Sequence, residues 1–251
     1  MCDVYAHEYD LMTNAAARES YHAREVAALA EAFKPTSVLD AGCATGLTAM
    51  LFARLGVAAT GLDRSRKMIS LARGKYGASG RSPVFRVGQF ESLPGLLHGR
   101  FDLVVCLANA ISGVGSVANL RKSLRNFCRV LKPGGALVLQ MLNYAALKEG
   151  EVMPVRATRS DGIIWVRYSI RRGRKLALHA VRLDIDESPP LLEPFYHELD
   201  NFTVERVTQA MRSAGFRQLH RYADLLLSKR FTKSARDLVI VTRRPAGRQT
   251  V

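Results

Sequence analysis

The sequence predicts an α/β protein with a doubly wound, mostly parallel sheet of seven strands and a small antiparallel β insert. The first observation is that short apolar runs typical of buried strands alternate with helix-like segments up to about residue 142. The second is that this alternation stops there, and strand-like runs then follow one another without a helix between them. The third is size: 251 residues with 48% hydrophobic and 24% charged side chains can bury one large core.

The first part of the chain supplies five strands in order. Residues 14–33 are alanine-rich with helical spacing and end before Lys34-Pro35, and Val38-Leu39-Asp40 is typical of a short buried strand. The segments expected next are a helix at 46–55, strand 57–62, helix 65–76, strand 84–88, strand 101–107, helix 117–131 and strand 136–142. Strands that alternate with helices pair in parallel, so the carboxyl ends of these strands share one edge of the sheet.

The insert and the end of the sheet follow. The runs Ile163–Ile170 and Leu176–Ile185 are strand-like and are joined by the turn candidate Arg172-Gly173-Arg174. A helix is expected over Thr203–Ala214, with Thr203 as N-cap and Gly215 as C-cap, followed by strands 216–222 and 238–242. We therefore expect one domain formed by residues 1–142 and 203–251, with a helical lid at about 1–33, and an insert of residues 143–202 that covers the site.

Charge is unevenly distributed. Lys and Arg number 37 against 22 Asp and Glu, a net charge of +15, and residues 156–182 alone have a balance of +7. Such a surface attracts nucleic acid, lipid headgroups or an acidic small molecule. The alternative is a solvated arginine-rich face, because the basic residues are not interleaved with the aromatics that a nucleic-acid channel uses.

Several classes of protein are excluded or disfavoured. No apolar run approaches the length that spans a bilayer, and the N-terminus lacks a basic segment followed by an apolar one, so we expect a cytoplasmic protein with no membrane association. The four cysteines at positions 2, 43, 106 and 128 form no Cys-x-x-Cys pattern. We expect reduced thiols and no metal site, with Cys106 in the core.

A glycine loop directly follows the first strand. It reads Asp40-Ala41-Gly42-Cys43-Ala44-Thr45-Gly46 and leads into a helix, so its backbone and the helix N-terminus can hold a ligand at the edge of the sheet. The G-x-G-x-x-G pattern of dinucleotide-binding proteins would need glycine at positions 44 and 47, where Ala44 and Leu47 stand. The Gly-Lys-Ser/Thr of triphosphate-binding loops is absent as well. Both ligand classes are therefore disfavoured.

An acidic residue ends the second strand, at Asp63, 23 residues after Asp40. A carboxylate there can accept hydrogen bonds from both hydroxyls of a ribose. A cofactor that contains ribose but no pyrophosphate fits both features.

Three motifs resemble those of the class I S-adenosylmethionine-dependent methyltransferases, which have a Rossmann-like fold. The glycine loop with Val38-Leu39 before it resembles their first motif, Gly61-Leu62-Asp63-Arg64-Ser65 their acidic second motif, and Arg129–Gly135 their late motif. Within the class, Val105–Ala110 and Leu139–Tyr144 are most similar to the glycine/sarcosine N-methyltransferase-like small-molecule group. The resemblance extends over roughly residues 5–244.

The resemblance implies a cofactor site for S-adenosyl-L-methionine, with S-adenosyl-L-homocysteine as the product and no metal. The methionine part is expected on the loop, the ribose on Asp63 and the adenine beside Gln89 and Phe90. Tyr9 resembles a lid tyrosine and Arg18 an arginine that holds the carboxylate of the cofactor. The full set of expected cofactor residues is Tyr9, Arg18, Asp40, Ala41, Gly42, Ala44, Gly46, Asp63, Arg64, Gln89, Phe90 and Leu107. From the residues alone, Asp40 either holds the loop through backbone amides or contacts the cofactor.

On the acceptor side, the resemblance assigns Asn109 and His197. Leu142 stands where glycine-methylating members have an arginine for the substrate carboxylate, which argues against glycine as the acceptor. Arg156 or Arg167 of the insert are candidates to replace that arginine. If the acceptor is a hydroxyl, a general base is needed, and Tyr196, His197 and Tyr144 are the candidates.

The sequence thus predicts a methyltransferase that acts on an amine or hydroxyl of a small molecule, which is acidic if the charge of the insert is used. Transfer is expected by in-line displacement that depends mainly on alignment of the reactants. The alternatives are an RNA or other nucleic-acid methyltransferase, and a non-catalytic protein that binds the cofactor. A homodimer stays open.

Overall fold

The computed structural model describes residues 6–77, 82–93, 97–153, 157–173, 175–200 and 202–246. Within them, a seven-stranded sheet has the order β11-β12-β5-β4-β1-β2-β3. All neighbours from β5 to β3 pair in parallel, and β12 pairs antiparallel with both β5 and β11. The strands are β1 (Ser37–Ala41), β2 (Ala58–Asp63), β3 (Val84–Val87), β4 (Phe101–Cys106), β5 (Leu131–Leu142), β11 (Arg217–Tyr222) and β12 (Asp237–Arg243). The predicted mostly parallel sheet is confirmed.

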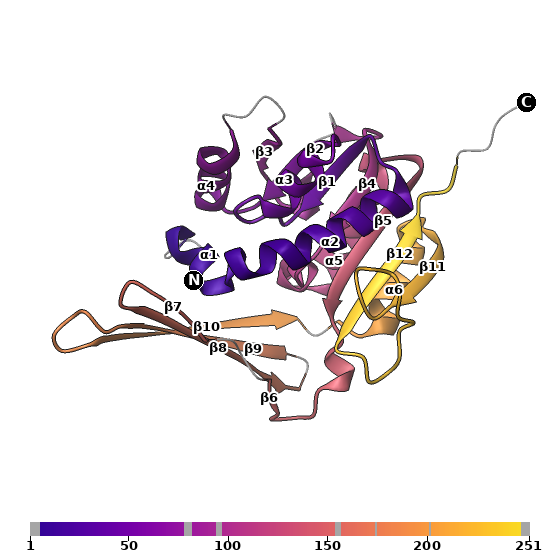
Figure 1. The fold of residues 1–251 in the computed structure, drawn as a ribbon. Helices are drawn as coiled ribbons and strands as arrows, with labels where there is room; N and C mark the ends of the chain where they lie inside the picture. Colours follow the sequence, from indigo (N-terminus) through magenta and orange to yellow (C-terminus); the bar gives the residue numbers. More distant parts are fainter. Residues whose placement is uncertain are drawn as a thin grey trace, which may run out of the picture.

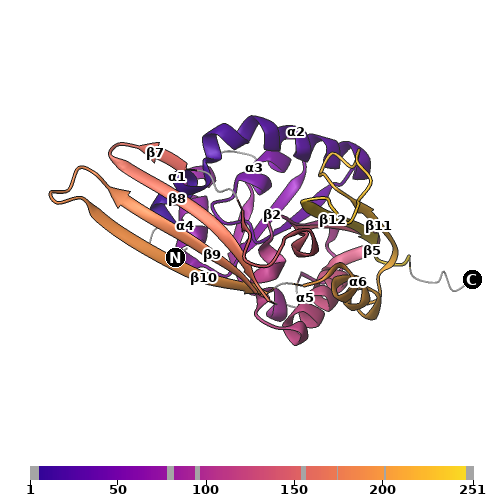
Figure 2. The ribbon, with the colours of Figure 1, turned by 90° about the horizontal axis from the view of Figure 1, so that it is seen from below.

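Helices cover both faces of this sheet, as Figure 2 shows. Three of them pack on one face and two on the other, so the strands are buried on both sides and read as continuous apolar runs. The first group is α2 (Ala15–Phe33), α3 (Leu47–Arg54) and α4 (Arg66–Tyr76), and the second is α5 (Val117–Val130) and α6 (Val204–Ser213). Among the described residues, no helix is both long and apolar enough to cross a membrane.

Side-chain caps fix the starts of three helices. Ser65, Ser116 and Thr203 each accept a hydrogen bond from the backbone N–H three residues later, which satisfies one of the unpaired donors of the first turn. The cap predicted at Thr203 is confirmed. At the other end of α6 the C-cap is Ala214, not Gly215 as predicted, and Gly215 follows it with φ +100°.

Strand β5 begins at Leu131, five residues before the start predicted from the Lys-Pro-Gly-Gly motif. Leu131 pairs with Phe101, the register then shifts, and Ala136 pairs with Leu103. The motif is therefore an irregular part of the strand and not a loop before it. Its glycines and proline are typical of a loop, so the sequence did not predict a strand there.

A second, antiparallel sheet lies beside the first and extends to the lower left in Figure 1. Its order is β10-β9-β8-β6, with β7 paired to β8. The strands are β6 (Val152–Met153), β7 (Ala157–Ser160), β8 (Ile163–Arg172), β9 (Lys175–Asp184) and β10 (Leu191–Asp200). The antiparallel insert is confirmed, but the sequence missed β10. That strand contains Pro194, which is tolerated because β10 is the edge of its sheet.

Short elements join these layers. The N-terminal turns η1 (Ala6–Glu8) and α1 (Tyr9–Thr13) lie between the second sheet and α4, where Figure 1 shows them beside β7 and β8. Three more 3-10 turns matter below: η2 (Phe90–Ser92), η4 (Ala110–Val114), which contacts β10, and η5 (Tyr144–Ala146) after β5. The division into domains 1–142 with 203–251 and 143–202 stays a prediction.

Candidate functional site

A cavity of about 460 Å³ lies between α2 and the edge of the large sheet where the parallel strands end. Asp40 on β1, Gln140 on β5 and Asp237 on β12 line it. Deeper in the sheet, Val38, Val138 and Val241 belong to the same core cluster as α2. Because side chains two residues apart share a face of a strand, the polar residues stand at the rim of this apolar face. The cavity is therefore a polar pocket at the edge of the core cluster that α2 forms with the sheet.

The glycine loop forms one end of the cavity. The amides of Gly42 and Cys43 both donate to the carbonyl of Leu62, at 2.8 and 3.0 Å, so the loop turns tightly over the end of β2. Gly42 has φ +88°, and a Cβ at this position would lie 2.6 Å from the Cβ of Ala110. Glycine is thus required by conformation and by space. Ala41 is fully buried at the end of β1, and Gly46, with φ +91°, is the N-cap of α3.

Asp63 connects the loop to the second motif. Its Oδ2 accepts the backbone N–H of Ala44 at 2.9 Å, and its Oδ1 accepts that of Ser65 at the same distance. Each carboxylate oxygen has capacity for a further hydrogen bond. Asp63 can therefore hold the loop and a hydroxylated ligand at the same time.

Asp40 is the most unusual side chain in the cavity. It is 2% exposed, and its Oδ2 has no hydrogen-bond partner. Burial, with a contribution from the charge of Asp63, raises the pKa of Asp40 to about 7. The carboxylate has a backbone hydrogen bond with Ala49, but a buried carboxylate oxygen without a donor is unfavourable, so a ligand group that donates a hydrogen bond to Oδ2 would be bound strongly.

Tyr9 and Arg18 reach the same cavity from the N-terminal segment. Arg18 donates to Thr13 Oγ1 at 3.3 Å, while its Nε is buried and lacks a partner. The structure therefore brings a guanidinium and the Asp40 carboxylate to one end of the pocket. Leu107, which is 5% exposed, forms the apolar wall between them and β4.

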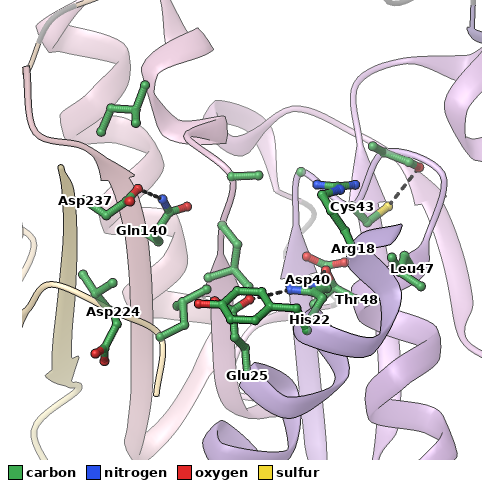
Figure 3. Close-up of a pocket in the computed structure, with 18 of the residues that line it drawn as sticks. Arg18, His22, Glu25, Asp40, Cys43, Leu47, Thr48, Gln140, Asp224 and Asp237 are labelled. Atoms are coloured by element: carbon green, nitrogen blue, oxygen red, sulfur yellow. Dashed lines mark hydrogen bonds and ion pairs between the residues drawn. The ribbon is translucent and has the colours of Figure 1, made fainter. Parts of the chain in front are cut away.

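The other end of the cavity is rich in carboxylates that sequence reasoning missed. Gln140 donates to Asp237 Oδ1 at 2.6 Å, and burial raises the pKa of Asp237. Asp224 and Glu25 line the cavity as well. Figure 3 shows Gln140, Asp237 and Asp224 on one side, Arg18, Asp40 and Cys43 on the other, and Glu25 and His22 of α2 between them. The sequence signal for Gln140 was a single polar residue within an otherwise apolar strand.

Glu25 is buried at 8% exposure and is held by its helix neighbours. His22 Nδ1 lies 2.9 Å from Glu25 Oε2, and His22 Nε2 lies 2.8 Å from Thr48 Oγ1 on α3. The negative charge of Glu25, followed by burial, raises the pKa of Tyr21. Four carboxylates and two guanidinium groups, Arg18 and Arg236, line the cavity. The lining is acidic in a chain whose net charge is +15.

The expected adenine residues lie on the other face of the loop and do not line this cavity. Phe90 packs edge-on against Phe127 with ring centroids 5.2 Å apart, and a Cβ on Gly42 would lie 3.4 Å from its ring. Gln89 is exposed beside it. Arg64 is exposed and donates to the carbonyl of Gly113 at 3.2 Å. These three residues surround the Asp63 side of the loop.

Asn109 lies at the end of β4 but is fully engaged with its neighbours. Its Oδ1 accepts from Ser112 Oγ at 2.9 Å and from the backbone N–H of Leu142 at 3.1 Å, and its Nδ2 donates to the Tyr144 hydroxyl at 2.7 Å. Tyr144 is 1% exposed, and burial raises its pKa. Together they fasten the loop after β4 to the end of β5. They are beside the cavity but are not among the residues that line it.

His197 and Tyr196 are on β10 of the second sheet. Burial, followed by the charge of Arg64, lowers the pKa of His197, which favours the neutral imidazole. Tyr196 is 53% exposed, donates to Glu198 at 2.5 Å and packs edge-on against His179. The two neighbours therefore point to opposite faces of β10.

Much of the positive charge of the insert is paired within the chain. Arg182 forms ion pairs with Glu8, Asp184 and Glu193 at 3.1 to 3.3 Å. Arg171 donates to the carbonyl of Leu147, and Lys175 pairs with Asp200 at 2.8 Å. Arg156 and Arg174 lie outside the described residues. The insert is therefore less free to bind an anion than its composition suggests.

Burial decides the reactivity of two cysteines. Cys43 and Cys106 are buried, and burial raises the pKa of both thiols, so neither is a reactive thiolate. The described residues contain no group of three or more His, Cys, Asp or Glu arranged to hold a metal.

Comparison with known proteins shows the family of this chain. A family described as "Methyltransferase domain" matches residues 38–135. A glycine/sarcosine N-methyltransferase from Halorhodospira halochloris is 31% identical over 183 residues, 66% of this chain and 68% of that protein. A ubiquinone biosynthesis O-methyltransferase from Xanthomonas euvesicatoria is 35% identical over 106 residues, 42% of this chain and 43% of that protein.

A solved structure covers more of the chain. An amino pentose methyltransferase from Micromonospora echinaspora, involved in calicheamicin biosynthesis and solved with S-adenosylmethionine bound, covers 92% of this chain and 96% of its own. Its TM-score is 0.75 at 26% identity.

The sheet order, the glycine loop after β1 and the acidic residue that ends β2 are features of a fold that binds a ribose-containing cofactor at the edge of its sheet. With the relatives above, the chain belongs to the class I S-adenosylmethionine-dependent methyltransferases, of small-molecule type. S-adenosylmethionine is the cofactor. The residues present fit it: the cavity offers an unpartnered buried carboxylate oxygen, an unpartnered guanidinium nitrogen and a loop whose glycines allow close approach. The nucleic-acid and non-catalytic alternatives are not favoured.

Proposed function

We propose that this protein methylates the nitrogen of a small-molecule amine. When bound, S-adenosylmethionine supplies a methyl group that is already activated by the positive charge of its sulfonium. The protein then has to bind the acceptor, align it and receive its proton. Two of the relatives support nitrogen as the target. One is a glycine/sarcosine N-methyltransferase, and the other is a methyltransferase of an amino pentose.

The cofactor residues divide into charged, hydroxyl-binding and apolar groups. Arg18 would hold the carboxylate of the methionine part through its buried Nε, which has no partner. Asp40 would hold the ammonium through its buried Oδ2, which has no partner either. Asp63 would accept the ribose hydroxyls. Tyr9, Ala41, Gly42, Ala44, Gly46 and Leu107 would shape the surface between these groups, and Arg64, Gln89 and Phe90 would border the adenine.

The acidic end of the cavity is the observation that carries the assignment of an amine. A protonated amine is the ligand that Asp237, Asp224 and Glu25 favour, since these carboxylates raise the local concentration of cations. Before the nitrogen can attack, the ammonium must lose a proton. Asp237 is suited to receive it, because burial raises the pKa of this carboxyl above that of an exposed aspartate.

Asn109 and Tyr144 would act by fixing the part of the cavity lining that faces the acceptor. Their hydrogen bonds fix the backbone of Leu142, which lines the cavity between the glycine loop and Asp237. His197, neutral near pH 7, would serve as a second proton acceptor if the acceptor enters from the second sheet. Tyr196 faces the other way from it and would take part only after a rearrangement of β10.

The charge of the insert supports an acidic acceptor less than its sequence suggests. Arg182, Arg171 and Lys175 are bonded within the chain, and Arg167 also has an interaction partner. We therefore favour an amine without a required acidic group, and the acidic acceptor stays a prediction. Cytoplasmic location and a homodimer are also kept as expectations of the proposal.

A transfer assay tests the proposal. Purified protein and S-adenosylmethionine with a labelled methyl group are incubated with matched pairs of metabolites that differ only in an amine, a hydroxyl or a carboxylate. We expect label in the amines, and Asp237→Asn to lower kcat/KM for the best amine by about 10 to 1000-fold, as loss of a positioned charge does. Asp186→Asn removes an exposed carboxylate between β9 and β10 and serves as control. Transfer to hydroxyl compounds but not to amines contradicts the proposal.

A further inference from the structure

A buried carboxylate joins the N-terminal turn to the second sheet. Glu8 is 8% exposed, and its Oε2 accepts the indole N–H of Trp165 at 2.6 Å. Arg182 donates from Nε to the same carboxylate at 3.1 Å. These partners are 157 and 174 residues away along the chain. Glu8 therefore holds together parts of the molecule that no local sequence feature connects.

Apolar packing reinforces this junction. Trp165 is fully buried with Met12 and Ala180 around it, and Phe195 stacks at a tilt with centroids 5.7 Å from the indole. Tyr9, which lines the cofactor cavity, packs on the same cluster. Because the interior of a protein is close-packed, a displacement of Tyr9 must be accommodated at the tryptophan.

A second carboxylate, Asp10 in the first turn of α1, holds the cofactor loop. Thr45, which lies between Ala44 and Gly46 and is 6% exposed, donates its hydroxyl to Asp10 Oδ1 at 2.6 Å. The other oxygen of Asp10 is paired with Lys75 of α4. Two carboxylates two residues apart thus hold the second sheet on one side and the cofactor loop on the other, and Figure 1 shows the turn between these layers.

We propose that Glu8 and Asp10 are positioning residues through which the cofactor loop and the second sheet are coupled, so that occupancy of the loop sets the position of the sheet beside the cavity. The path runs from Thr45 through Asp10 and Tyr9 to Glu8 and on to Trp165 and Arg182. Every step of this path is a hydrogen bond, an ion pair or a covalent link, and both of its ends are buried. The proposal rests on cofactor binding at the loop but not on the identity of the acceptor.

The sequence contains one tryptophan, Trp165, so fluorescence excited at the long-wavelength edge, where the eight tyrosines do not absorb, reports on this junction alone. Addition of S-adenosylhomocysteine to the wild-type protein is expected to change the emission of Trp165, although the indole does not line the cofactor cavity. Asp10→Ala removes the connection to the loop and is expected to reduce that change at least threefold at saturation. Thr45→Val, which keeps the shape of the side chain but removes the hydroxyl that donates to Asp10, provides a second variant if the alanine variant does not fold.

The reverse direction gives an independent measurement. Glu8→Gln loses the ion pair with Arg182 and makes no contact in the cavity, yet we expect it to weaken S-adenosylhomocysteine binding three- to tenfold in calorimetry. Glu187→Gln, which changes an exposed carboxylate between β9 and β10, is the matched control and should bind like the wild type. Circular dichroism verifies that each variant is folded.

The outcomes separate the coupling from cofactor binding itself. Wild-type affinity in Glu8→Gln together with an undiminished fluorescence change in Asp10→Ala overturns the coupling while leaving the cofactor site intact. Failure of the wild-type protein to bind S-adenosylhomocysteine overturns both. A smaller fluorescence change in Asp10→Ala with weaker binding by Glu8→Gln supports the proposal.

Discussion

Asp63 accepts the backbone N–H of Ala44 at 2.9 Å, so the acidic residue that ends β2 is part of the glycine loop that follows β1. The two motifs that a sequence shows as separate are one structural unit. A ligand that uses Asp63 is consequently bound by a carboxylate whose position is already fixed, which lowers the entropic cost of binding.

The first prediction concerns this carboxylate. Asp63→Ala is expected to weaken S-adenosylmethionine binding by roughly 1.5 to 3 kcal/mol, because charge-assisted hydrogen bonds are lost. Isothermal calorimetry measures the effect, with Glu31→Ala on the exposed side of α2 as control. Unchanged affinity in a folded Asp63→Ala protein would remove the ribose assignment.

The second prediction is a pH dependence that originates at Asp40. Its pKa is raised to about 7, so the carboxyl is protonated below this pH and forms an ion pair with an ammonium only above it. Affinity for S-adenosylhomocysteine should therefore rise as pH increases through about 7, and Asp40→Asn should lose this part of the dependence. Asp63, Glu25 and His22 are present in both proteins, so the difference between the two titrations isolates Asp40.

The same pKa has a consequence for stability. The folded-state pKa of Asp40 lies above its ordinary value of 3.8, so the folded protein binds this proton more tightly than the unfolded chain does. The contribution of Asp40 to the free energy of unfolding is present below pH 4 and is lost as pH rises to about 7. Thermal unfolding should show that the stability of Asp40→Asn, relative to that of the wild type, increases from pH 5 to pH 8. An equal difference at both pH values would contradict the assignment.

The third prediction compares two glycines. Gly42→Ala combines a φ of +88° with a Cβ placed 2.6 Å from Ala110, and should destabilise the protein by about 1 to 3 kcal/mol and abolish cofactor binding. Gly74→Ala on α4 meets nothing within 4 Å and should stabilise by roughly 0.5 to 1 kcal/mol. Denaturant unfolding of both variants measures the contrast. Equal stabilities would show that the loop can relax around a methyl group.

The fourth prediction concerns Asn109. Asn109→Ala removes the hydrogen bonds to Tyr144, Ser112 and Leu142, and should lower kcat/KM by about 10 to 1000-fold with cofactor affinity nearly unchanged. Tyr144→Phe removes only the bond to the hydroxyl and should have a smaller effect. Steady-state kinetics with the best acceptor decides it. A large loss of cofactor affinity would move Asn109 from the acceptor side to the cofactor loop.

Local features of the sequence were enough for the sheet and for the loop. The glycine turn, Asp63 and the alternation of strands and helices depend on residues close together in the chain, and each was predicted within a few residues. The acidic end of the cavity was not predicted, because Gln140 and Asp237 meet only through the pairing of β5 with β12, 97 residues apart. Strand β10 was missed for a related reason: at the edge of its sheet, its pattern need not be apolar.

Burial separated residue roles that the sequence could not separate. Tyr144 and Tyr196 were equal candidates for a base, yet Tyr144 is 1% exposed and Tyr196 is 53% exposed, on a face of β10 turned away from the large sheet. For the arginines of the insert, the sequence left a binding surface and a solvated face open, because partners such as Glu8 for Arg182 are far away in the chain. The catalytic roles of Tyr144 and Tyr196 stay predictions.

Strand β12 is placed between β5 and β11, although it is made last among the strands described. During synthesis, β5 is therefore an open edge until residues 237–243 leave the ribosome, and Leu137 and Leu139 have no partner strand on that side. Because Asp237 is the first residue of β12, the carboxylate-rich end of the cavity is completed in the same event that closes the sheet. A nascent or truncated chain that stops before residue 237 would hold the glycine loop but lack this end of the pocket, and its unpaired edge would make it prone to aggregate.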